Sequence, residues 1–266
     1  MLKIRRISKY FGKGTVNEVA AIRNLSLEVR PGEFVCVIGS NGAGKTTLLN
    51  CVSGTIIPDE GEVLLDGRDV TRWPEHERAA LIGRVFQDPL SGTCASMSIE
   101  ENLALANRRG KRRTLARGLK SAERALFAQI LGKLDLGLEV RLGDPAGLLS
   151  GGQRQALTLV MATLQRPTLL LLDEHTAALD PKTAGLIMDL TLELVERDKL
   201  TTFMITHNMQ QALNYGDRLV MIHNGEIILD LGRTEKERLT VGDLLDHFNE
   251  SKNGLGGVLN DRLVLG

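Results

Sequence analysis

Aromatic residues are scarce in this sequence, because one Trp, two Tyr and six Phe make up only 3% of its 266 residues. So few rings argue against the successive stacking platforms that bind single-stranded nucleic acids. An excess of charge of one sign is also missing, since 33 Lys and Arg balance 33 Asp and Glu. The chain therefore lacks the basic surplus typical of nucleic-acid-binding domains, and we expect no nucleic-acid partner.

Long apolar runs and paired cysteines are lacking as well. No uninterrupted apolar stretch is long enough to span a bilayer, and the opening residues MLKIRRISKYFG lack the apolar core of a signal peptide. The three cysteines, Cys36, Cys51 and Cys94, have no metal-ligand spacing. An odd number of cysteines fits a reducing compartment, so we expect a cytosolic protein in which all three are small buried hydrophobic residues.

Closely spaced strands open the chain. They are predicted at Leu2–Ile7, Leu25–Val29 and Val63–Leu65, with turns between them. The intervals are too short for helical crossovers. These strands therefore predict a separate antiparallel sheet.

Later strands alternate with helices, which predicts a mainly parallel sheet with helices on both faces. Buried strands are expected at Glu33–Gly39, Pro167–Asp173 and Thr201–His207. Helices are expected at Lys45–Ser53, where Gly54 is the cap, over about Ile99–Leu136, from Ser150 onward, and at Thr240–Phe248. A further helix is expected after the cap Asp180-Pro181, with an apolar stripe of Leu186, Ile187, Leu190 and Leu194. A hairpin with the turn Asn224-Gly225 is expected at Arg218–Leu231.

A phosphate-binding loop is predicted between the strand that ends at Gly39 and the helix that follows. The residues GSNGAGKT fit G-x-x-x-x-G-K-[ST] in the strand–loop–helix setting that this motif requires. Glycines let successive N–H groups face inward, and the helix start adds partial positive charge. Lys45 can reach the β- and γ-phosphates, and the Thr46 hydroxyl is a hard oxygen suited to Mg²⁺. The candidate phosphate-binding residues of this loop are Gly39, Ser40, Asn41, Gly42, Ala43, Gly44, Lys45, Thr46 and Thr47. The loop alone does not separate GTPases, kinases and ATPases.

Two acids follow the apolar strand Pro167–Asp173. Asp173 stands at its carboxyl end, where ligands of open α/β sheets bind, and its carboxylate can hold Mg²⁺ through the water shell of the ion. Glu174 follows immediately and points differently, well placed to polarise a water for attack on the γ-phosphorus. An ordinary acidic pair at a strand end is the alternative, but the phosphate loop upstream favours a functional role.

The residues Ser150 to Gln153 have the form of a helix capping box. Capping alone does not call for Gly151 and Gly152, which weaken a first helical turn. Two residues without side chains leave the backbone amides open to a ligand, and a terminal phosphate suits such a place.

Together, these motifs resemble the ATP-binding subunits of ABC (ATP-binding cassette) transporters over about Leu2 to Phe248. GSNGAGKTT resembles the Walker A loop, LLSGGQ the family signature, and LLLLDE Walker B. AALD, ending at Asp180, is similar to the D-loop. Gln87 resembles the Q-loop glutamine, His207 the H-loop histidine, and Phe11 the aromatic residue that stacks on adenine, with Tyr10 as the alternative.

The resemblance implies that the protein is an ATPase with ATP and Mg²⁺ as its ligands, and that two copies pair head to tail. Each ATP would lie between Gly39–Thr47 of one copy and Ser150–Gln153 of the other. The implied catalytic residues are Glu174, His207 and Gln87. The metal would be held by Thr46, Gln87 and Asp173. The ATP of the partner copy would be contacted by Ser150, Gly151, Gly152 and Gln153, and Asp180 would lie at the dimer seam.

The resemblance also implies an organisation and a set of partners. A P-loop NTPase core with an antiparallel β subdomain would occupy residues 1–248, with a helical subdomain at about 88–150 and a C-terminal tail at 249–266. Separate transmembrane permease subunits would dock near Asp88–Ala106 at the cytoplasmic face of the inner membrane, where the chain would be peripheral. An extracytoplasmic substrate-binding protein would complete the system.

The motif wording is similar to a bacterial importer group described as amino-acid-type, with aromatic amino acids suggested. An export ATPase and a soluble ABC ATPase of the iron–sulfur assembly type are the alternatives. Two features lie outside these motifs. His175 stands where the family usually has proline, either as a tolerated loop substitution or as a titrating contact at the dimer seam. The basic stretch 107–120 is a solvated face, a contact with anionic lipid headgroups or, third, a contact with RNA.

Overall fold

The computed structural model describes residues 1–111 and 119–252. The chain divides into two compact units. The unit that we call the helical unit comprises Met1, Ser53–Thr55 and Arg72–Thr202, and the sheet unit comprises Leu2–Val52, Ile56–Thr71 and Phe203–Gly266. Half of the basic stretch 107–120 and most of the tail 249–266 lie outside the described residues.

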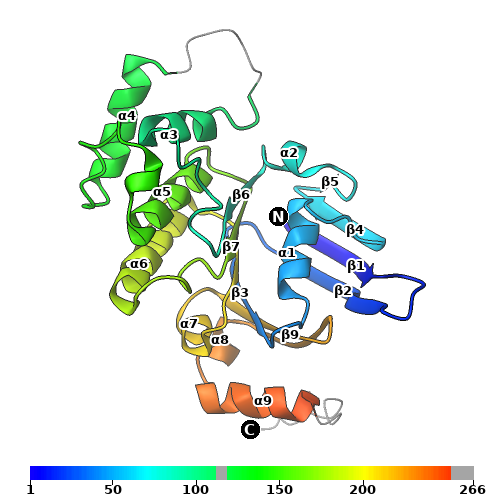
Figure 1. Ribbon diagram of the computed structural model, residues 1–266. Helices are drawn as coiled ribbons and strands as arrows, with labels where there is room; N and C mark the ends of the chain where they lie inside the picture. Colours follow the sequence, from blue (N-terminus) through cyan, green and yellow to red (C-terminus); the bar gives the residue numbers. More distant parts are fainter. Residues whose placement is uncertain (112–118, 253–266) are drawn as a thin grey trace. The chain divides into compact units, whose positions relative to one another are not determined.

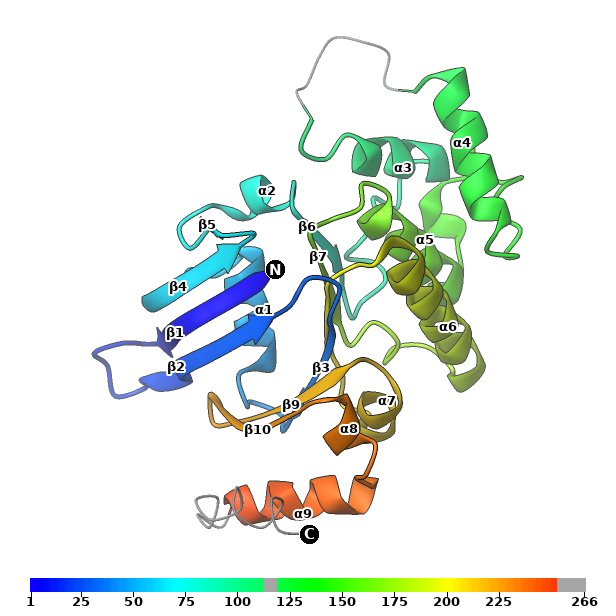
Figure 2. The same cartoon turned by 180° about the vertical axis from the view of Figure 1, so that it is seen from behind.

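An antiparallel sheet in the sheet unit confirms the prediction from the closely spaced strands. Its strands are β1 (Leu2–Phe11), β2 (Val19–Val29), β4 (Glu60–Leu65) and β5 (Arg68–Asp69), in the order β2-β1-β4-β5. Figure 2 shows β4, β1 and β2 side by side. The first two strands are longer than predicted, because the pairing of β1 with β2 shifts register between Ile4 and Ile7, where Arg6 has φ 46°. Such a bulge breaks the alternation on which strand prediction depends.

The second group of strands in the sheet unit surrounds β3 (Phe34–Gly39). It pairs in parallel with β9 (Arg218–His223), and β8 (Thr202–Ile205) follows it in the strand order. β9 continues through Asn224 and Gly225, both at positive φ, into the antiparallel β10 (Glu226–Leu231), which confirms the predicted hairpin. The helices here are α1 (Lys45–Ser53), whose predicted bounds are confirmed, α7 (Met209–Asn214), α8 (Arg233–Lys236) and α9 (Val241–Lys252).

The helical unit contains a parallel strand pair, β6 (Ile82–Val85) with β7 (Leu169–Asp173). Every residue of β7 is buried, as the run of leucines predicts. Its helices are α2 (Glu75–Arg78), α3 (Ile99–Asn107), α4 (Ser121–Gly132), α5 (Gly151–Thr163) and α6 (Pro181–Asp198), with a 3₁₀ turn at Ala146–Leu148 (Figure 1). α5 contacts β6, α3 and α6.

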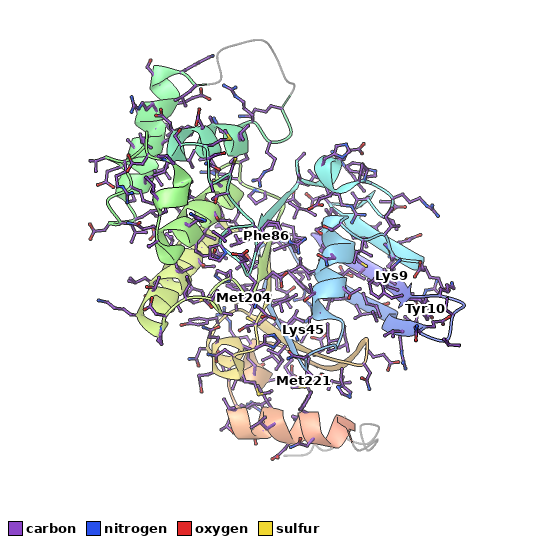
Figure 3. All side chains as sticks on the ribbon, viewed as in Figure 1. Lys9, Tyr10, Lys45, Phe86, Met204 and Met221 are labelled. Carbon is purple, nitrogen blue, oxygen red and sulfur yellow. The ribbon has the colours of Figure 1, made fainter. Side chains whose placement is uncertain are left out.

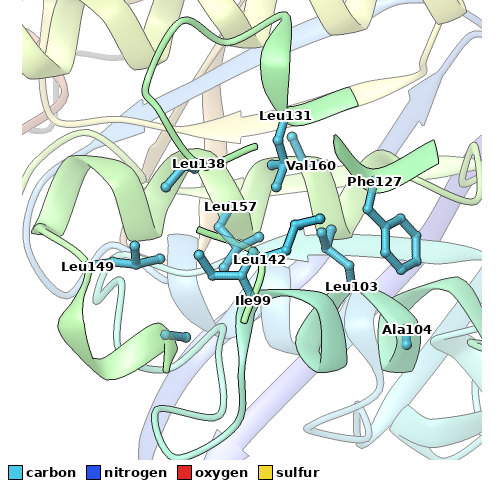
Figure 4. Close-up of a cluster of buried hydrophobic side chains, with 11 residues drawn as sticks. Ile99, Leu103, Ala104, Phe127, Leu131, Leu138, Leu142, Leu149, Leu157 and Val160 are labelled. Carbon is cyan, nitrogen blue, oxygen red and sulfur yellow. The ribbon is translucent and has the colours of Figure 1, made fainter. Parts of the chain in front are cut away.

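The long helical stretch predicted over Ile99–Leu136 is two helices, α3 and α4. α3 ends at Asn107, and Gly110 beyond it has φ +71°, which a continuing helix does not allow. Apolar residues of both helices form a cluster with residues of α5, shown in Figure 4. Its members are Ile99, Leu103, Ala104, Phe127, Leu131, Leu138, Leu142, Ala146, Leu149, Leu157 and Val160.

Two burial predictions are wrong. Cys36 and Cys51 are buried as expected, but Cys94 is exposed in the loop before α3. On α6, Leu186 is 53% exposed rather than part of the buried stripe. The buried face is rotated by one position and runs through Ile187, Met188, Thr191, Leu194 and Val195. Thr191 is therefore buried on this face, where the apolar pattern predicted Leu190. Within the two described ranges, no helix is long and apolar enough to cross a bilayer.

Candidate active site

The phosphate-binding loop lies in the sheet unit between β3 and α1. Gly39 has φ +155°, and a Cβ there would be 2.2 Å from the carbonyl oxygen of Ile222. Gly44 has φ +101°, and its Cβ would be 2.3 Å from the carbonyl oxygen of Ala21. Both positions therefore exclude a side chain because neighbouring strands approach closely. Gly42, by contrast, faces open space, so its freedom serves the shape of the loop.

Lys45 is folded into this loop, at the first residue of α1 (Figure 3). Its side chain is almost buried, and Nζ donates hydrogen bonds to the carbonyl oxygens of Gly39 at 2.8 Å and Ser40 at 2.9 Å. The amine thus places a positive charge inside the loop that leads into the first turn of α1. Thr46 is exposed and Thr47 is half-buried. An anion such as a polyphosphate suits this arrangement.

His207 lies at the end of β8, the strand next to β3. The turn that carries it is fixed, because Thr206 N donates to the carbonyl oxygen of Val37 at 3.1 Å. The Thr206 hydroxyl is hydrogen-bonded to the Gln211 side chain and accepts from the backbone N–H of Asn208. Asn208 is also the N-cap residue of α7. The sheet unit therefore brings the exposed imidazole to the end of the strand beside the one that leads into the phosphate loop.

The aromatic candidates lie at the end of β1. Phe11 is 43% exposed, and Lys9 Nζ lies 5.9 Å from the centre of its ring. Lys13 Nζ lies 5.2 Å from the centre of the Tyr10 ring. Figure 3 shows Lys9 and Tyr10 extending from this strand. The sequence analysis did not identify Lys9 and Lys13, because no motif in the sequence links these lysines to the two rings.

The helical unit holds both acids at the end of β7. Asp173 is 8% exposed, and its Oδ2 accepts from Arg84 Nη2 at 3.3 Å. Glu174 is 9% exposed and has φ +47°, a left-handed backbone that only a few per cent of non-glycine residues adopt. Strain of this kind costs about 1–3 kcal/mol and gathers at functional sites. Gln87, two residues beyond β6, is exposed.

Gln155 is a buried residue that the sequence analysis missed. From α5, its Nε2 donates to the carbonyl oxygen of Phe86 at 3.1 Å and to that of His175 at 2.7 Å. These carbonyls belong to the residues next to Gln87 and Glu174. One amide therefore fixes the backbone at both candidate catalytic positions of this unit. In the sequence, the only indication of this role is a polar residue inside an apolar helical run.

The signature residues begin α5 as predicted. Ser150 Oγ accepts from Gln153 N at 3.2 Å, and Gln153 Oε1 accepts from Ser150 N at 3.2 Å, a complete capping box. The glycines differ. A Cβ on Gly152 would be 2.2 Å from Thr183 Cγ2, so this glycine permits packing against α6, whereas Gly151 is exposed and its Cβ would make an ordinary contact. Only Gly151 fits the expectation that both glycines exist to open the amides.

Asp180 caps α6, as predicted, by accepting from Thr183 N at 3.1 Å. This hydrogen bonding lowers the pKa of the exposed carboxyl.

His175 is buried inside its own chain rather than placed at an exposed seam. Only 2% of it is exposed, and Nε2 lies 3.0 Å from Thr191 Oγ1 on α6. Burial lowers the pKa of this imidazole to about 4, so it is neutral near neutral pH. The interpretation as a titrating contact at the dimer seam is therefore wrong.

A glycine loop between a buried strand and a helix, with an acid-ended buried strand in the same chain, defines a P-loop nucleoside triphosphatase. Comparison with known proteins gives the family. Residues 22–177 match the family model described as ABC transporter. The chain is 46% identical over 248 residues to the tyrosine transport ATP-binding protein of Clostridioides difficile, which covers 93% of this chain and 98% of that protein.

A second relative and a solved structure agree. The chain is 35% identical to the methionine import ATP-binding protein MetN of Rhizobium johnstonii, over 86% of this chain and 60% of that protein. It is 29% identical to a dimeric ATP-binding cassette solved in a post-hydrolysis state with ADP and Pi, with a TM-score of 0.72, covering 88% of this chain and 99% of that one. The chain belongs to the ABC transporter family. It is an ATP-binding subunit with ATPase activity, and the predicted α/β fold class is confirmed.

Proposed function

We propose that this chain energises a bacterial importer of an amino-acid-type solute by binding and hydrolysing ATP. The observation that carries the proposal is the 46% identity, over nearly the full length of both chains, with a tyrosine transport ATP-binding protein. The second relative is named for methionine import, which again is an amino acid. Export and a role without transport are the alternatives, and no relative described above is named for either.

In this proposal, ATP is bound first by Gly39–Thr47, with the adenine stacked on Phe11, and two copies then close head to tail. The exposed Ser150 and Gly151 and the first N–H groups of α5 would meet the γ-phosphate of the partner copy, with Gly152 and Gln153 shaping that turn. Asp180 would lie at the seam. Support comes from the solved relative, which is a dimer. Hydrolysis removes the terminal phosphate that bridges the copies, so the dimer reopens.

The residues present fit a magnesium ion that arrives with the nucleotide. Within residues 1–111 and 119–252, no cluster of three or more His, Cys, Asp or Glu could hold a metal by itself. Mg²⁺ is usually held by one or two protein oxygens together with substrate phosphates, and Asp173, the Thr46 hydroxyl and the Gln87 amide are such oxygen donors. When bound, the ion would neutralise phosphate charge.

The proposed catalytic roles follow from the chemistry of each side chain. The Glu174 carboxylate orients and deprotonates the attacking water, and its fixed backbone favours one orientation. His207 donates a hydrogen bond to the γ-phosphate. Gln87 contacts the water or the metal and senses the nucleotide.

The proposed assembly has separate transmembrane permease subunits and an extracytoplasmic substrate-binding protein. The permease would dock near Asp88–Ala106, where Leu90 is 63% and Leu105 is 58% exposed. The subunit would then be peripheral at the cytoplasmic face of the inner membrane. The bounds proposed for the cassette stay at residues 1–248, with the helical subdomain at about 88–150.

Two experiments test this function. Glu174→Gln should abolish ATP turnover, retain ATP binding, and shift the protein to a nucleotide-bound dimer in size-exclusion chromatography with light scattering. Lys45→Ala is the matched control, because it should lose binding and so form no such dimer. Normal turnover in Glu174→Gln would remove Glu174 from its role.

Affinity purification from native membranes addresses the transport role. Copurification of a permease and a binding protein that retains an amino acid is the expected result. Exclusively soluble partners would refute import.

A further inference from the structure

The side chains of Arg84 and Asp173 lie on the same face of the β6–β7 pair. In the parallel register, Arg84 stands opposite Leu171, and Asp173 follows Leu171 by two positions. Residues two apart on a strand share a face, so both side chains project to one side. The other side is closed to a long side chain, because a Cβ on Gly83 would be 2.4 Å from the carbonyl oxygen of Ala162 in α5.

The guanidinium of Arg84 is held by several groups on that face. Nη2 lies 3.3 Å from Asp173 Oδ2, while Nη1 donates to Ser53 Oγ at 3.2 Å and Thr55 Oγ1 at 3.3 Å. Its Cζ lies 4.7 Å from the centre of the Phe86 ring. The guanidinium is thus fixed by an ion pair, by two hydroxyls of the segment Ser53–Thr55 in the same unit, and by an aromatic face.

This ion pair is shielded from water. The side chain of Arg84 is 13% exposed and that of Asp173 is 12% exposed. At such exposure, charge interactions are stronger than at an open surface, and a carboxylate stripped of its partner is costly. The carboxylate proposed to hold the metal therefore already has a positively charged partner supplied by the chain itself.

We propose that Arg84 sets the affinity of the Asp173 carboxylate for a divalent cation by competing with it for the same negative charge. The inference rests on the proposed metal role of Asp173 and adds a residue that this role does not include. A cation that approaches Asp173 meets the repulsion of the fixed guanidinium. Arg84 keeps the carboxylate oriented while the metal is absent and weakens metal binding, so that the metal enters together with the phosphates.

The test compares Mn²⁺ binding in the full-length wild type, Arg84→Met and Arg84→Lys, measured by electron paramagnetic resonance with ADP at a fixed concentration. Removal of one unit charge close to a divalent ion should tighten Mn²⁺ binding on the order of tenfold in Arg84→Met. Arg84→Lys keeps the charge and should bind Mn²⁺ like the wild type. Both comparisons measure the affinity for Mn²⁺ and do not depend on ATP turnover.

Two further variants separate the possible failures. Arg141→Met removes a guanidinium that is paired with Asp144 at 2.8 Å elsewhere in the helical unit, and it should leave Mn²⁺ affinity unchanged. Asp173→Asn should weaken Mn²⁺ binding. If it does, and Arg84→Met binds Mn²⁺ no more tightly than the wild type, the competition is refuted while the metal role stands. If Asp173→Asn has no effect, the metal role falls and the inference falls with it. Should Arg84→Met not fold, Arg84→Lys binding Mn²⁺ about tenfold more tightly would refute a competition based on charge.

Discussion

Acidification should destabilise this protein through His175. Burial lowers the pKa of the imidazole from an ordinary 6.5 to about 4 in the folded chain. Between these two pH values the unfolded chain binds a proton that the folded chain does not, so stability falls as the pH falls through this window. One pKa unit corresponds to about 1.4 kcal/mol, so the full loss is about 3 kcal/mol, complete near pH 4.

The variant His175→Gln isolates this contribution. Thr191 Oγ1 already donates to the carbonyl oxygen of Ile187 at 2.7 Å, so His175 Nε2 must be the donor in its contact with Thr191. A glutamine amide can replace that donor but does not titrate. The free energy of unfolding in urea, measured at pH 7.5 and 4.5, should fall by about 2–3 kcal/mol more in the wild type than in His175→Gln.

The comparison between proteins cancels the carboxylates, which also titrate in acid. His76→Gln, which removes an exposed imidazole, is the matched control. The reasoning is refuted if wild type and His175→Gln lose the same free energy on acidification. It is equally refuted if the nuclear magnetic resonance signal of His175 in the folded protein titrates with a midpoint near 6.5.

Two further predictions concern packing and hydrogen bonding. Phe127→Ala should lower the free energy of unfolding by about 3–5 kcal/mol, because the ring is fully buried in the cluster of Figure 4; urea unfolding measures this, and a loss under about 1 kcal/mol would contradict it. Gln155→Leu should lower kcat for ATP hydrolysis more than it changes KM, because it releases the carbonyls of Phe86 and His175 without touching the phosphate loop. A changed KM with normal kcat would place Gln155 in nucleotide binding instead.

Local rules predicted much of the fold. The bounds of α1, the capping box at Ser150–Gln153, the Asp180 cap and the hairpin turn at Asn224-Gly225 each depend on neighbours within four residues, which a sequence displays directly. Burial was harder to predict. Leu186 looked like a core residue, but α6 presents a face rotated by one position, and only the packing against α5 decides which face is inside.

The candidate site divides in the same way. Its motif residues could be named from spacing, but the contacts that hold them could not. Arg84 and Asp173 are 89 positions apart, and Gln155 and Phe86 are 69 apart, so no periodicity links them. His175 showed itself only as a departure from the usual motif, and its partner Thr191 lies on another element.

The two adjacent acids are held by different physical forces. Asp173 depends on an ion pair with Arg84, whose strength changes with the charge brought near it. Glu174, in contrast, is followed by His175, which is held by two neutral groups. The carbonyl oxygen of His175 accepts from Gln155, and the imidazole of His175 is hydrogen-bonded to Thr191. A metal and its phosphates should therefore rearrange the contacts of Asp173 while the left-handed backbone at Glu174 stays in place. The proposed division of labour follows, in which the Asp173 carboxylate responds to what is bound and the Glu174 carboxylate keeps the orientation needed to activate the attacking water.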